Sequence, residues 1–282
     1  MQSSQAPSEG VILDDIDARP GSTASLLRTF IGLYLRRLDG WISASDLVRF
    51  AGRLGIPPAQ ARTGFTRLKQ KGLLLAAREG GIGYRLNPAA IPMLERGDRR
   101  IFDVRQMAIG DPWCLLSFSI PETRRDLRHR LRRRLQWIGC GMVSPALWIC
   151  PGYLQDEVED ILAELDARES ATLFRTQTPQ VAGSLATAVA GWWDLTALRA
   201  EHELFQESIV ALPDAVSEPF AAYVRLIDAW RVLPYRDPGL PAQLLPPDWP
   251  GQRSFDAHAR LSAQLAAPAW DFVRATVGLS AD

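Results

Sequence analysis

The sequence predicts an α+β protein made of separate N-terminal, central and C-terminal domains. Between residues 43 and 85, two short amphipathic helices are followed by a glycine-containing hairpin. From residue 113 to 176, apolar strands alternate with two amphipathic helices, and beyond residue 195 the pattern is helical. The chain has 282 residues and 47% of them are hydrophobic, so it exceeds one average domain and can bury more than one core.

Residues 1–21 are expected to form a disordered leader ahead of the first domain. They are polar and acidic, and they lack the basic and apolar regions of a signal peptide. No apolar run of the sequence approaches the length of a membrane span. We therefore expect a cytoplasmic protein without a membrane segment.

The first helix of the N-terminal pair is predicted to begin after Ser43. Ser43 and Asp46 resemble a capping box, and apolar residues follow at helical spacing. Gly55 ends this helix, and Pro57-Pro58 opens the next one after a short turn. Two helices joined this tightly form a unit that many DNA-binding proteins use.

The second helix, in the segment ARTGFTRLKQKG, has one apolar and one polar face. Ala61, Phe65 and Leu68 fall together and are expected to pack inward. Thr and Gln side chains hydrogen-bond base edges, whereas Arg and Lys reach guanine or phosphates. A basic helix taken alone is more often a solvated surface, but the preceding helix and turn favour DNA binding. The predicted contacts are Arg62, Thr63, Thr66, Arg67, Lys69, Gln70 and Lys71.

A two-stranded hairpin is predicted after this helix. Residues 73–77 and 83–86 have strand character, and the turn between them contains Gly80-Gly81. Arg78 and Arg85 would contact phosphates. Together with the two helices, this hairpin predicts a winged helix-turn-helix domain over residues 22–87, followed by a helical linker over 88–112.

The formal net charge of zero is a sum of regions with opposite signs. Residues 22–100 contain 14 Lys or Arg against 5 Asp or Glu, a net charge of +9, whereas residues 154–282 contain 9 against 19, a net charge of −10. A basic N-terminal region suits double-stranded DNA, and the acidic C-terminal region does not. DNA contact is therefore expected near the N-terminus.

The central domain is predicted over residues 113–178. Strands are expected at 113–120, 142–144, 147–150 and 172–176, with helices at 122–137 and 154–167. This βαββαβ order is that of a ferredoxin-like fold, in which one sheet face stays open for a partner domain or a second subunit. We expect a homodimer.

The first helix of the central domain contains an arginine cluster. Three interpretations remain open: pairing with the acidic C-terminal region, a site for a small anionic ligand, or contact with flanking DNA. The cluster comprises Arg124, Arg125, Arg128, Arg130, Arg132, Arg133 and Arg134.

Neither a disulfide framework nor a metal site is expected. Cys114, Cys140 and Cys150 are odd in number, widely spaced and set in apolar surroundings, which suits reduced core thiols. The three histidines show no metal-ligand spacing. We expect no metal and no cofactor.

Residues 179–282 are predicted to form a C-terminal helical domain. Helices are expected at 195–210, 219–233 and 254–277. The proline-rich segment between the last two, Asp237 to Gly251, cannot be helical. A flexible linker is the alternative, but Leu240, Leu244, Leu245 and Trp249 favour a packed loop.

Several motifs resemble the PaaX-type transcriptional repressors of phenylacetate catabolism. The resemblance covers nearly everything after Gly21, and its most specific part is the last motif. The motifs are GWISASDLVRFAGRLGI with ARTGFTRLKQKG, WCLLSFSIPETRRDLRHRLRRRLQWIGCGMVSPALWICP, GWWDL, and AWRVLPYRDPGLPAQLLPPDWPG. The family architecture is a winged helix, a ferredoxin-like domain resembling the small CRISPR-associated nucleases, and a helical domain.

The resemblance implies a dimer that occupies a palindromic operator of a phenylacetate operon until phenylacetyl-coenzyme A releases it. Relatives can serve other aromatic-acid pathways, so the effector is expected more generally to be an aryl-acyl-CoA. A coenzyme A thioester needs cations for its phosphates and an apolar slot for its acyl group. Arg128 and Arg132 with Trp192 and Trp230 could supply them, although the tryptophans also suit a core.

The alternative class is an enzyme, either a ferredoxin-like metal-dependent nuclease or an enzyme acting on acyl thioesters. The similar nucleases hold a metal with an Asp near the end of the first strand, where this chain has LLSFSIP. Ser117 and Ser119 cannot replace that carboxylate. No G-x-S-x-G motif is present, and Cys150 has no neighbouring base in the sequence. The sequence therefore favours a protein that is not an enzyme.

Overall fold

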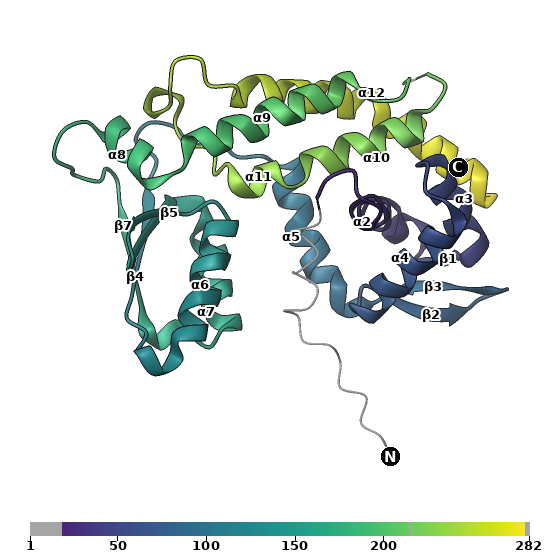
Figure 1. The fold of residues 1–282 in the computed structure, drawn as a ribbon, viewed down its shortest axis with the longest axis horizontal. Coiled ribbons are helices and arrows are strands. Elements are labelled where there is room, and N and C mark those ends of the chain that lie inside the picture. The colour runs from purple at the N-terminus through teal and green to yellow at the C-terminus, as the bar shows by residue number, and fades with distance from the viewer. Residues whose placement is uncertain (1–18, 215, 280–282) are drawn as a thin grey trace. The chain divides into compact units, whose positions relative to one another are not determined.

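The computed structural model describes residues 19–214 and 216–279, so most of the predicted leader lies outside the described residues. The chain is α+β, with two antiparallel sheets. Two compact units are formed by discontinuous segments (Figure 1). The first unit comprises the chain up to Phe102 with Phe205–Val232 and the chain from Phe255, and the second comprises Asp103–Leu204 with Leu233–Ser254. The segment predicted as one C-terminal helical domain, 179–282, therefore contributes to both units.

In the first unit, helices surround a small three-stranded sheet. Strands β1 (Trp41–Ser43), β2 (Leu74–Arg78) and β3 (Ile82–Leu86) pair in the order β1-β3-β2. The helices from the N-terminal region are α2 (Thr23–Tyr34), α3 (Ala44–Arg53), α4 (Pro58–Gln70) and α5 (Ile91–Phe102). The two helices and the hairpin predicted between residues 43 and 86 are confirmed, whereas α2 and β1 were not predicted.

The core of the first unit is an aromatic cluster drawn from both ends of the chain. Phe30 lies 5.0 Å from Phe50 and 5.9 Å from Phe220, measured between ring centroids. Phe220 in turn stacks on Phe272 at 5.4 Å. Phe220 belongs to α10 (Pro219–Trp230) and Phe272 to α12 (Gly251–Val277). Helices from the C-terminal third thus complete the core beneath α2 and α3.

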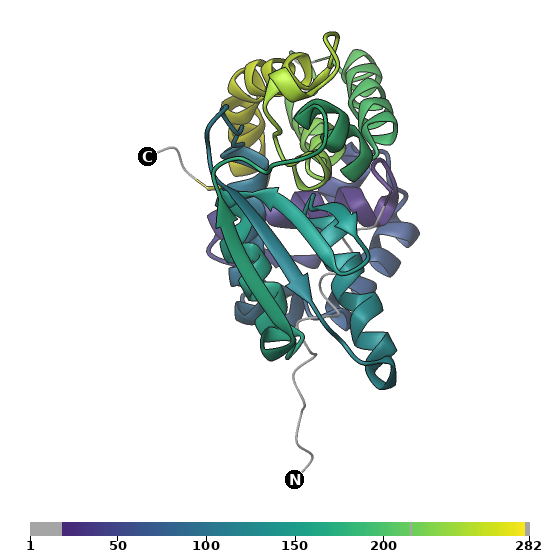
Figure 2. The same ribbon diagram turned by 90° about the vertical axis from the view of Figure 1, so that its left-hand side faces the viewer.

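The second unit contains a four-stranded sheet. Strands β4 (Trp113–Phe118), β5 (Gly141–Ser144), β6 (Leu147–Pro151) and β7 (Ala171–Thr176) run antiparallel in the order β5-β6-β4-β7, as Figure 2 shows. Helices α6 (Arg125–Trp137) and α7 (Gln155–Glu164) cover one face, and Leu116, Leu131 and Leu162 are buried between them and the sheet. The chain order is β4-α6-β5-β6-α7-β7.

The other face of this sheet packs against segments of the same unit. Trp113 and Ile149 are buried there with Val189 of α8 (Leu185–Trp192), a helix that was not predicted. Gly141 permits this contact, because a Cβ at that position would lie 2.7 Å from the Trp193 ring. The sequence predicted that one face would be available to a partner domain or a second subunit, and a segment of the predicted C-terminal domain packs on part of this face. Phe174 of β7 remains 54% exposed.

The proline-rich segment after α11 (Leu233–Arg236) is packed, as predicted. Leu240 is buried, and Leu244, Leu245 and Trp249 pack in the same cluster. Asp237 anchors the start of the segment to α9 (Leu195–Val210): its Oδ2 lies 2.7 Å from Nε2 of His202, and its Oδ1 accepts from the Gly239 amide at 2.8 Å. The buried acceptor thus fixes a loop that contains no regular ladder.

Candidate nucleic-acid interface

The turn between α3 and α4 is fixed by local backbone chemistry. Ser43 caps α3, because its Oγ accepts from the Asp46 amide at 3.0 Å. Gly55 follows the helix with a φ of 77°, which glycine adopts without steric cost. Pro58 then occupies the first turn of α4, where its missing N–H is not needed. The sequence signals predicted this turn, and it sets the direction in which α4 leaves α3.

Helix α4 has the two faces that the sequence predicted. Ala61, Phe65 and Leu68 are buried. Gly64 is set against α2 so closely that a Cβ there would lie 2.3 Å from Cδ1 of Leu27. On the other side, six of the predicted contact residues are exposed and Lys71 is half-buried. The exposed six are Arg62, Thr63, Thr66, Arg67, Lys69 and Gln70.

The exposed face of α4 keeps its cationic and hydrogen-bonding groups available. Within the described part of the chain, none of Arg62, Arg67 and Lys69 pairs with a carboxylate. The hydroxyls of Thr63 and Thr66 donate to the carbonyls of Ala59 and Arg62, at 3.1 and 2.9 Å. Their oxygens therefore remain acceptors, and their methyl groups face outward with them. This face can accept from base amino groups and donate to phosphates.

The hairpin residues differ in their partners. Arg78 is exposed at the end of β2. Arg85 instead forms an ion pair with Glu79 across the turn, and its Nη1 donates to the Asp39 carbonyl at 3.3 Å. The Arg85 charge is largely neutralised where it stands, so of the two predicted phosphate contacts Arg78 is the better placed.

Helix α10 supports the α3–α4 turn from a distant part of the sequence. Arg225 of α10 donates through Nη2 to the Leu54 carbonyl at 2.7 Å. Leu54 is the C-cap of α3, directly before Gly55. A carbonyl at the end of a helix has no intrahelical partner, and a guanidinium supplies one. Sequence reasoning missed this contact because the two residues are separated by 171 positions.

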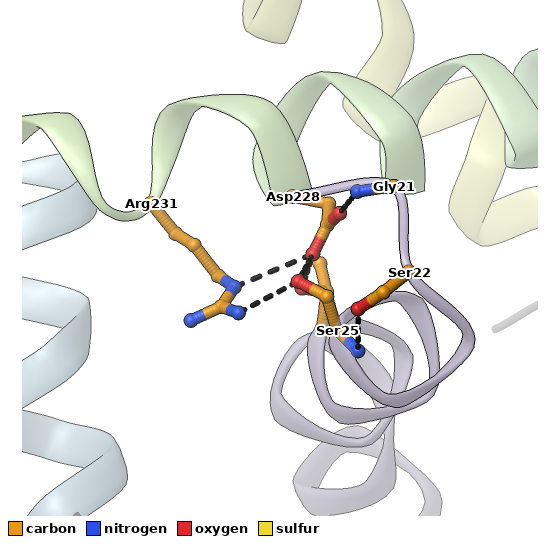
Figure 3. Close-up of polar contacts among 6 residues, drawn as sticks. Gly21, Ser22, Ser25, Asp228 and Arg231 are labelled. Carbon is orange, nitrogen blue, oxygen red and sulfur yellow. Dashed lines mark hydrogen bonds and ion pairs between the residues drawn. The ribbon is translucent and has the colours of Figure 1, made fainter. Parts of the chain in front are cut away.

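A buried carboxylate joins α10 to the start of α2, as Figure 3 shows. Oδ1 of Asp228 accepts from the hydroxyls of Ser25 and Thr29, at 2.5 and 2.8 Å, and its Oδ2 accepts from the Gly21 amide at 2.7 Å. Arg231 completes the group by donating from Nη2 to Ser25 Oγ at 2.7 Å. Asp228 is 1% exposed, and every donor around it comes from the same unit. No sequence signal pointed to this cluster.

The residues predicted for the effector are not brought together. Arg128 and Arg132 lie on α6, against one face of the four-stranded sheet, whereas Trp192 packs on the opposite face. Trp230 belongs to the first unit, is 0% exposed and stacks on His258 with ring centroids 4.3 Å apart. A single pocket lined by all four is therefore not supported, because the sheet separates two of them and Trp230 is a core residue.

Arg128, Arg132 and Arg134 of α6 each bind a group of the second unit. Arg128 pairs with Glu122 at 2.6 Å, Arg132 donates to the Pro145 carbonyl at 2.7 Å, and Arg134 pairs with Glu164 of α7. The partners are neighbours in the same domain. Glu164 belongs to the acidic region 154–282, so Arg134 shows the predicted pairing, whereas Arg128 and Arg132 do not.

The cysteines lie in the core of the second unit and are reduced. Cys114 and Cys150 are opposite each other on β4 and β6. A hydrogen bond to Cys150, together with burial, raises the pKa of the Cys114 thiol. Within residues 19–214 and 216–279, no group of three or more His, Cys, Asp or Glu is arranged to hold a metal ion. No described helix is long and apolar enough to cross a membrane.

Comparison with known proteins gives three matches along the chain. Residues 22–90 match the family model described as PaaX-like protein, residues 106–188 the PaaX protein central Cas2-like domain, and residues 193–275 the PaaX-like protein C-terminal domain. The chain belongs to the PaaX family. The three matches follow one another along the chain in the order of the predicted N-terminal, central and C-terminal domains.

One curated relative is the transcriptional repressor PaaX of Escherichia coli strain K12. It is 27% identical over 270 residues, which cover 92% of this chain and 85% of the relative. Among solved structures, uncharacterized protein Rv0674 from Mycobacterium tuberculosis aligns with a TM-score of 0.58 and 23% identity. The alignment covers 85% of this chain and 95% of Rv0674, so the PaaX-family fold is shared along most of both chains.

Proposed function

We propose that this chain is a sequence-specific DNA-binding transcriptional repressor, and that α3, α4 and the β2–β3 hairpin form a winged helix-turn-helix. The observation that carries the proposal is the exposed α4 face, on which unpaired Arg62, Arg67 and Lys69 stand beside hydroxyl and amide groups. Major-groove recognition requires this combination, because amide and guanidinium groups read base edges while cations bind phosphates. The similarity to a transcriptional repressor over 92% of the chain supports the same function.

The central domain is proposed to be ferredoxin-like. The strand order β5-β6-β4-β7 with two helices on one face supports this. We further propose that the chain acts as a homodimer on a palindromic operator, since two-fold proteins bind two-fold sites. Analytical ultracentrifugation of the chain with and without operator DNA tests this: a species that stays monomeric in both states contradicts it.

The effector is proposed to be an aryl-acyl-CoA such as phenylacetyl-coenzyme A, acting on a phenylacetate operon. The proposal rests on the resemblance of the chain to the repressors of phenylacetate catabolism. Release requires that the ligand bind a state of low DNA affinity more tightly than the operator-bound state.

Enzymatic activity is not proposed. A thioester-cleaving cysteine must be exposed as a thiolate, whereas Cys150 is 2% exposed and hydrogen-bonded to Cys114. At the end of β4, where the similar nucleases place an Asp, this chain has Ser117 and Ser119. A time course with phenylacetyl-coenzyme A or with DNA and Mg²⁺ should therefore give no product; turnover of either would replace the repressor proposal.

The deciding experiment is fluorescence anisotropy of labelled duplex from the chain's own upstream region, at fixed salt. A scrambled duplex of equal length is the control. We expect preferential binding to the upstream duplex, and release by phenylacetyl-coenzyme A but not by free coenzyme A or phenylacetate. Preferential binding without release removes the effector and keeps the repressor. Equal binding to both duplexes removes the repressor proposal.

A further inference from the structure

Helix α6 has an exposed cationic face that the winged helix does not include. Over Arg125–Trp137 it contains six arginines against one acidic residue, Asp126, for a net charge of +5. Its buried side consists of Leu127, Leu131 and Leu135, which pack on the sheet. The charge of this helix is thus concentrated on the surface that faces solvent.

Exposure divides the arginines of α6 into two groups. Arg128, Arg132 and Arg134 are half-buried and bind Glu122, the Pro145 carbonyl and Glu164. These contacts fix both sides of the helix: Arg134 lies on the side of α7, and Arg132 on the side of the β5–β6 turn. These contacts hold the helix in place.

The remaining group is exposed and lies between those flanks. We call Arg125, Arg130 and Arg133 the α6 outer arginines; all three are exposed. Arg125 and Arg133 are two turns apart, with exposed His129 between them, and Nε of Arg125 donates to Nε2 of His129 at 3.2 Å. At a rise of about 1.5 Å per residue, Arg125 and Arg133 lie about 12 Å apart along the helix axis, and Arg130 lies three residues before Arg133. The outer arginines therefore present three cations spread along the exposed side of α6, a row rather than a single charge.

We propose that the α6 outer arginines bind the phosphate backbone of double-stranded DNA, as a second, sequence-independent contact in addition to that of the winged helix. This proposal rests on the proposed DNA binding. A row of guanidinium groups on a rigid helix matches a surface with regularly spaced phosphates, and such contacts add affinity without reading bases.

Two other occupants fit the charge less well. The phosphates of a coenzyme A ligand require an adjoining apolar slot for the acyl group. The outer arginines lie on the solvent side of α6, away from its buried leucines. A second copy of the chain could offer acidic α7, which has Asp156, Glu157, Glu159, Asp160 and Glu164. Exposed ion pairs of that kind contribute little to association.

The test is the salt dependence of DNA binding by the full-length chain. The variant Arg125→Gln/Arg130→Gln/Arg133→Gln is compared with Arg105→Gln/Arg168→Gln/Arg175→Gln, which removes three exposed arginines elsewhere in the second unit. The probes are a long labelled duplex from the upstream region and its scrambled counterpart. Circular dichroism melts verify that both variants are folded.

For three phosphate contacts, the decrease of log K with log salt should be less steep in the outer-arginine variant, by about 2 to 3 in slope. Between 50 and 200 mM salt, the wild-type chain should then lose about 40-fold more affinity than this variant. Both duplexes should be affected alike, and the control variant should keep the wild-type slope.

An unchanged slope in the outer-arginine variant overturns the proposal. An altered response to phenylacetyl-coenzyme A with an unchanged slope also overturns the proposal and would assign the row to a ligand. A change of oligomeric mass with an unchanged slope overturns it as well and would assign the row to a second copy. Failure of the repressor proposal itself is seen separately, as equal wild-type affinity for the upstream and scrambled duplexes.

Discussion

At the scale of single residues, partners decide which cations of the N-terminal region can meet DNA. Arg62 and Arg67 are exposed on α4 with no carboxylate partner among the described residues, whereas Arg85 is paired with Glu79. A paired arginine must give up its partner before it binds a phosphate, and an unpaired one does not. Arginines that look equivalent in the sequence are therefore expected to contribute unequally to DNA binding.

Replacing Arg62 or Arg67 by Ala should weaken operator binding by about 1 to 3 kcal/mol if the side chain reads a base, with a matching loss of specificity. Arg85→Ala should cost less. Anisotropy on the upstream and scrambled duplexes measures both quantities. Arg260→Ala, which removes an exposed arginine of α12, is the control. Unchanged affinity in both α4 variants would refute the assignment of α4 as the DNA-reading helix.

His258 makes the stability of the chain depend on pH. Burial lowers its pKa from 6.5 to about 4, and its ring stacks on Trp230. The unfolded chain binds this proton at a higher pH than the folded chain does. The free energy of unfolding should therefore decrease as pH falls from about 6.5 to about 4, by about 3 kcal/mol in total from this group.

Urea denaturation of the wild-type chain and of His258→Phe across this range tests the effect. Phe keeps an aromatic ring against Trp230 and removes the titrating group. The unfolding free energy of the wild-type chain minus that of His258→Phe should decrease steadily as pH falls from 6.5 to 4, and it should stay constant above pH 7. A difference that does not vary with pH contradicts the shifted His258.

At the scale of secondary structure elements, the close approach of α2 and α4 depends on Gly64. A Cβ at this position would lie 2.3 Å from Cδ1 of Leu27, a side chain that is 1% exposed. Gly64→Ala should therefore destabilise the chain by about 1 to 3 kcal/mol despite the better helix propensity of Ala. Thermal denaturation measures the loss.

The double variant Gly64→Ala/Leu27→Ala tests the cause, because it removes the atom that the new methyl group meets. Its stability should exceed the value obtained by adding the effects of the two single variants. Simple additivity of the two would show that the contact between Gly64 and Leu27 is not responsible.

Helices α2 and α10 are joined by the carboxylate of Asp228. Asp228→Asn replaces one acceptor oxygen by an N–H₂ group that faces the donors of Ser25, Thr29 or Gly21, and it leaves buried Arg231 without its counter-charge. We expect a loss of about 3 kcal/mol or more. Urea denaturation is the measurement. Asp160→Asn, which changes an exposed carboxylate on α7, is the matched control and should unfold like the wild-type chain.

At the scale of the whole molecule, the helices proposed to read DNA depend on residues from the other end of the chain. The first unit is closed by Phe220 and Phe272, and Arg225 binds the Leu54 carbonyl. A fragment of residues 19–102 should therefore lack cooperative thermal unfolding and bind operator poorly, because the apolar faces of α2 and α3 would be exposed. A sharp melting transition and full operator affinity for this fragment would contradict this expectation.

Local signals in the sequence were sufficient for the helix pair of the first unit and for the order of strands and helices along the chain in the central domain. Ser43, Gly55 and Pro58 determine where α3 ends and α4 begins, since capping and φ preferences act over a few residues. The apolar spacing of Ala61, Phe65 and Leu68 likewise identified the buried side of α4. Helix α2 was missed although Leu26, Leu27, Phe30, Ile31 and Tyr34 recur at helical spacing on one side, so the sequence did contain a signal for it.

The sequence by itself thus determined most of the elements, the exposed face of α4 and membership of the PaaX family, because propensity, capping and motif similarity are properties of neighbouring residues. Only the tertiary structure decided that α10 belongs with α2 and α3, that Asp228 receives donors from Ser25 and Gly21, and that Trp192 and Trp230 lie in separate cores. These pairings join residues about 200 positions apart, and nothing in local sequence chemistry specifies which distant helix will fill an apolar face.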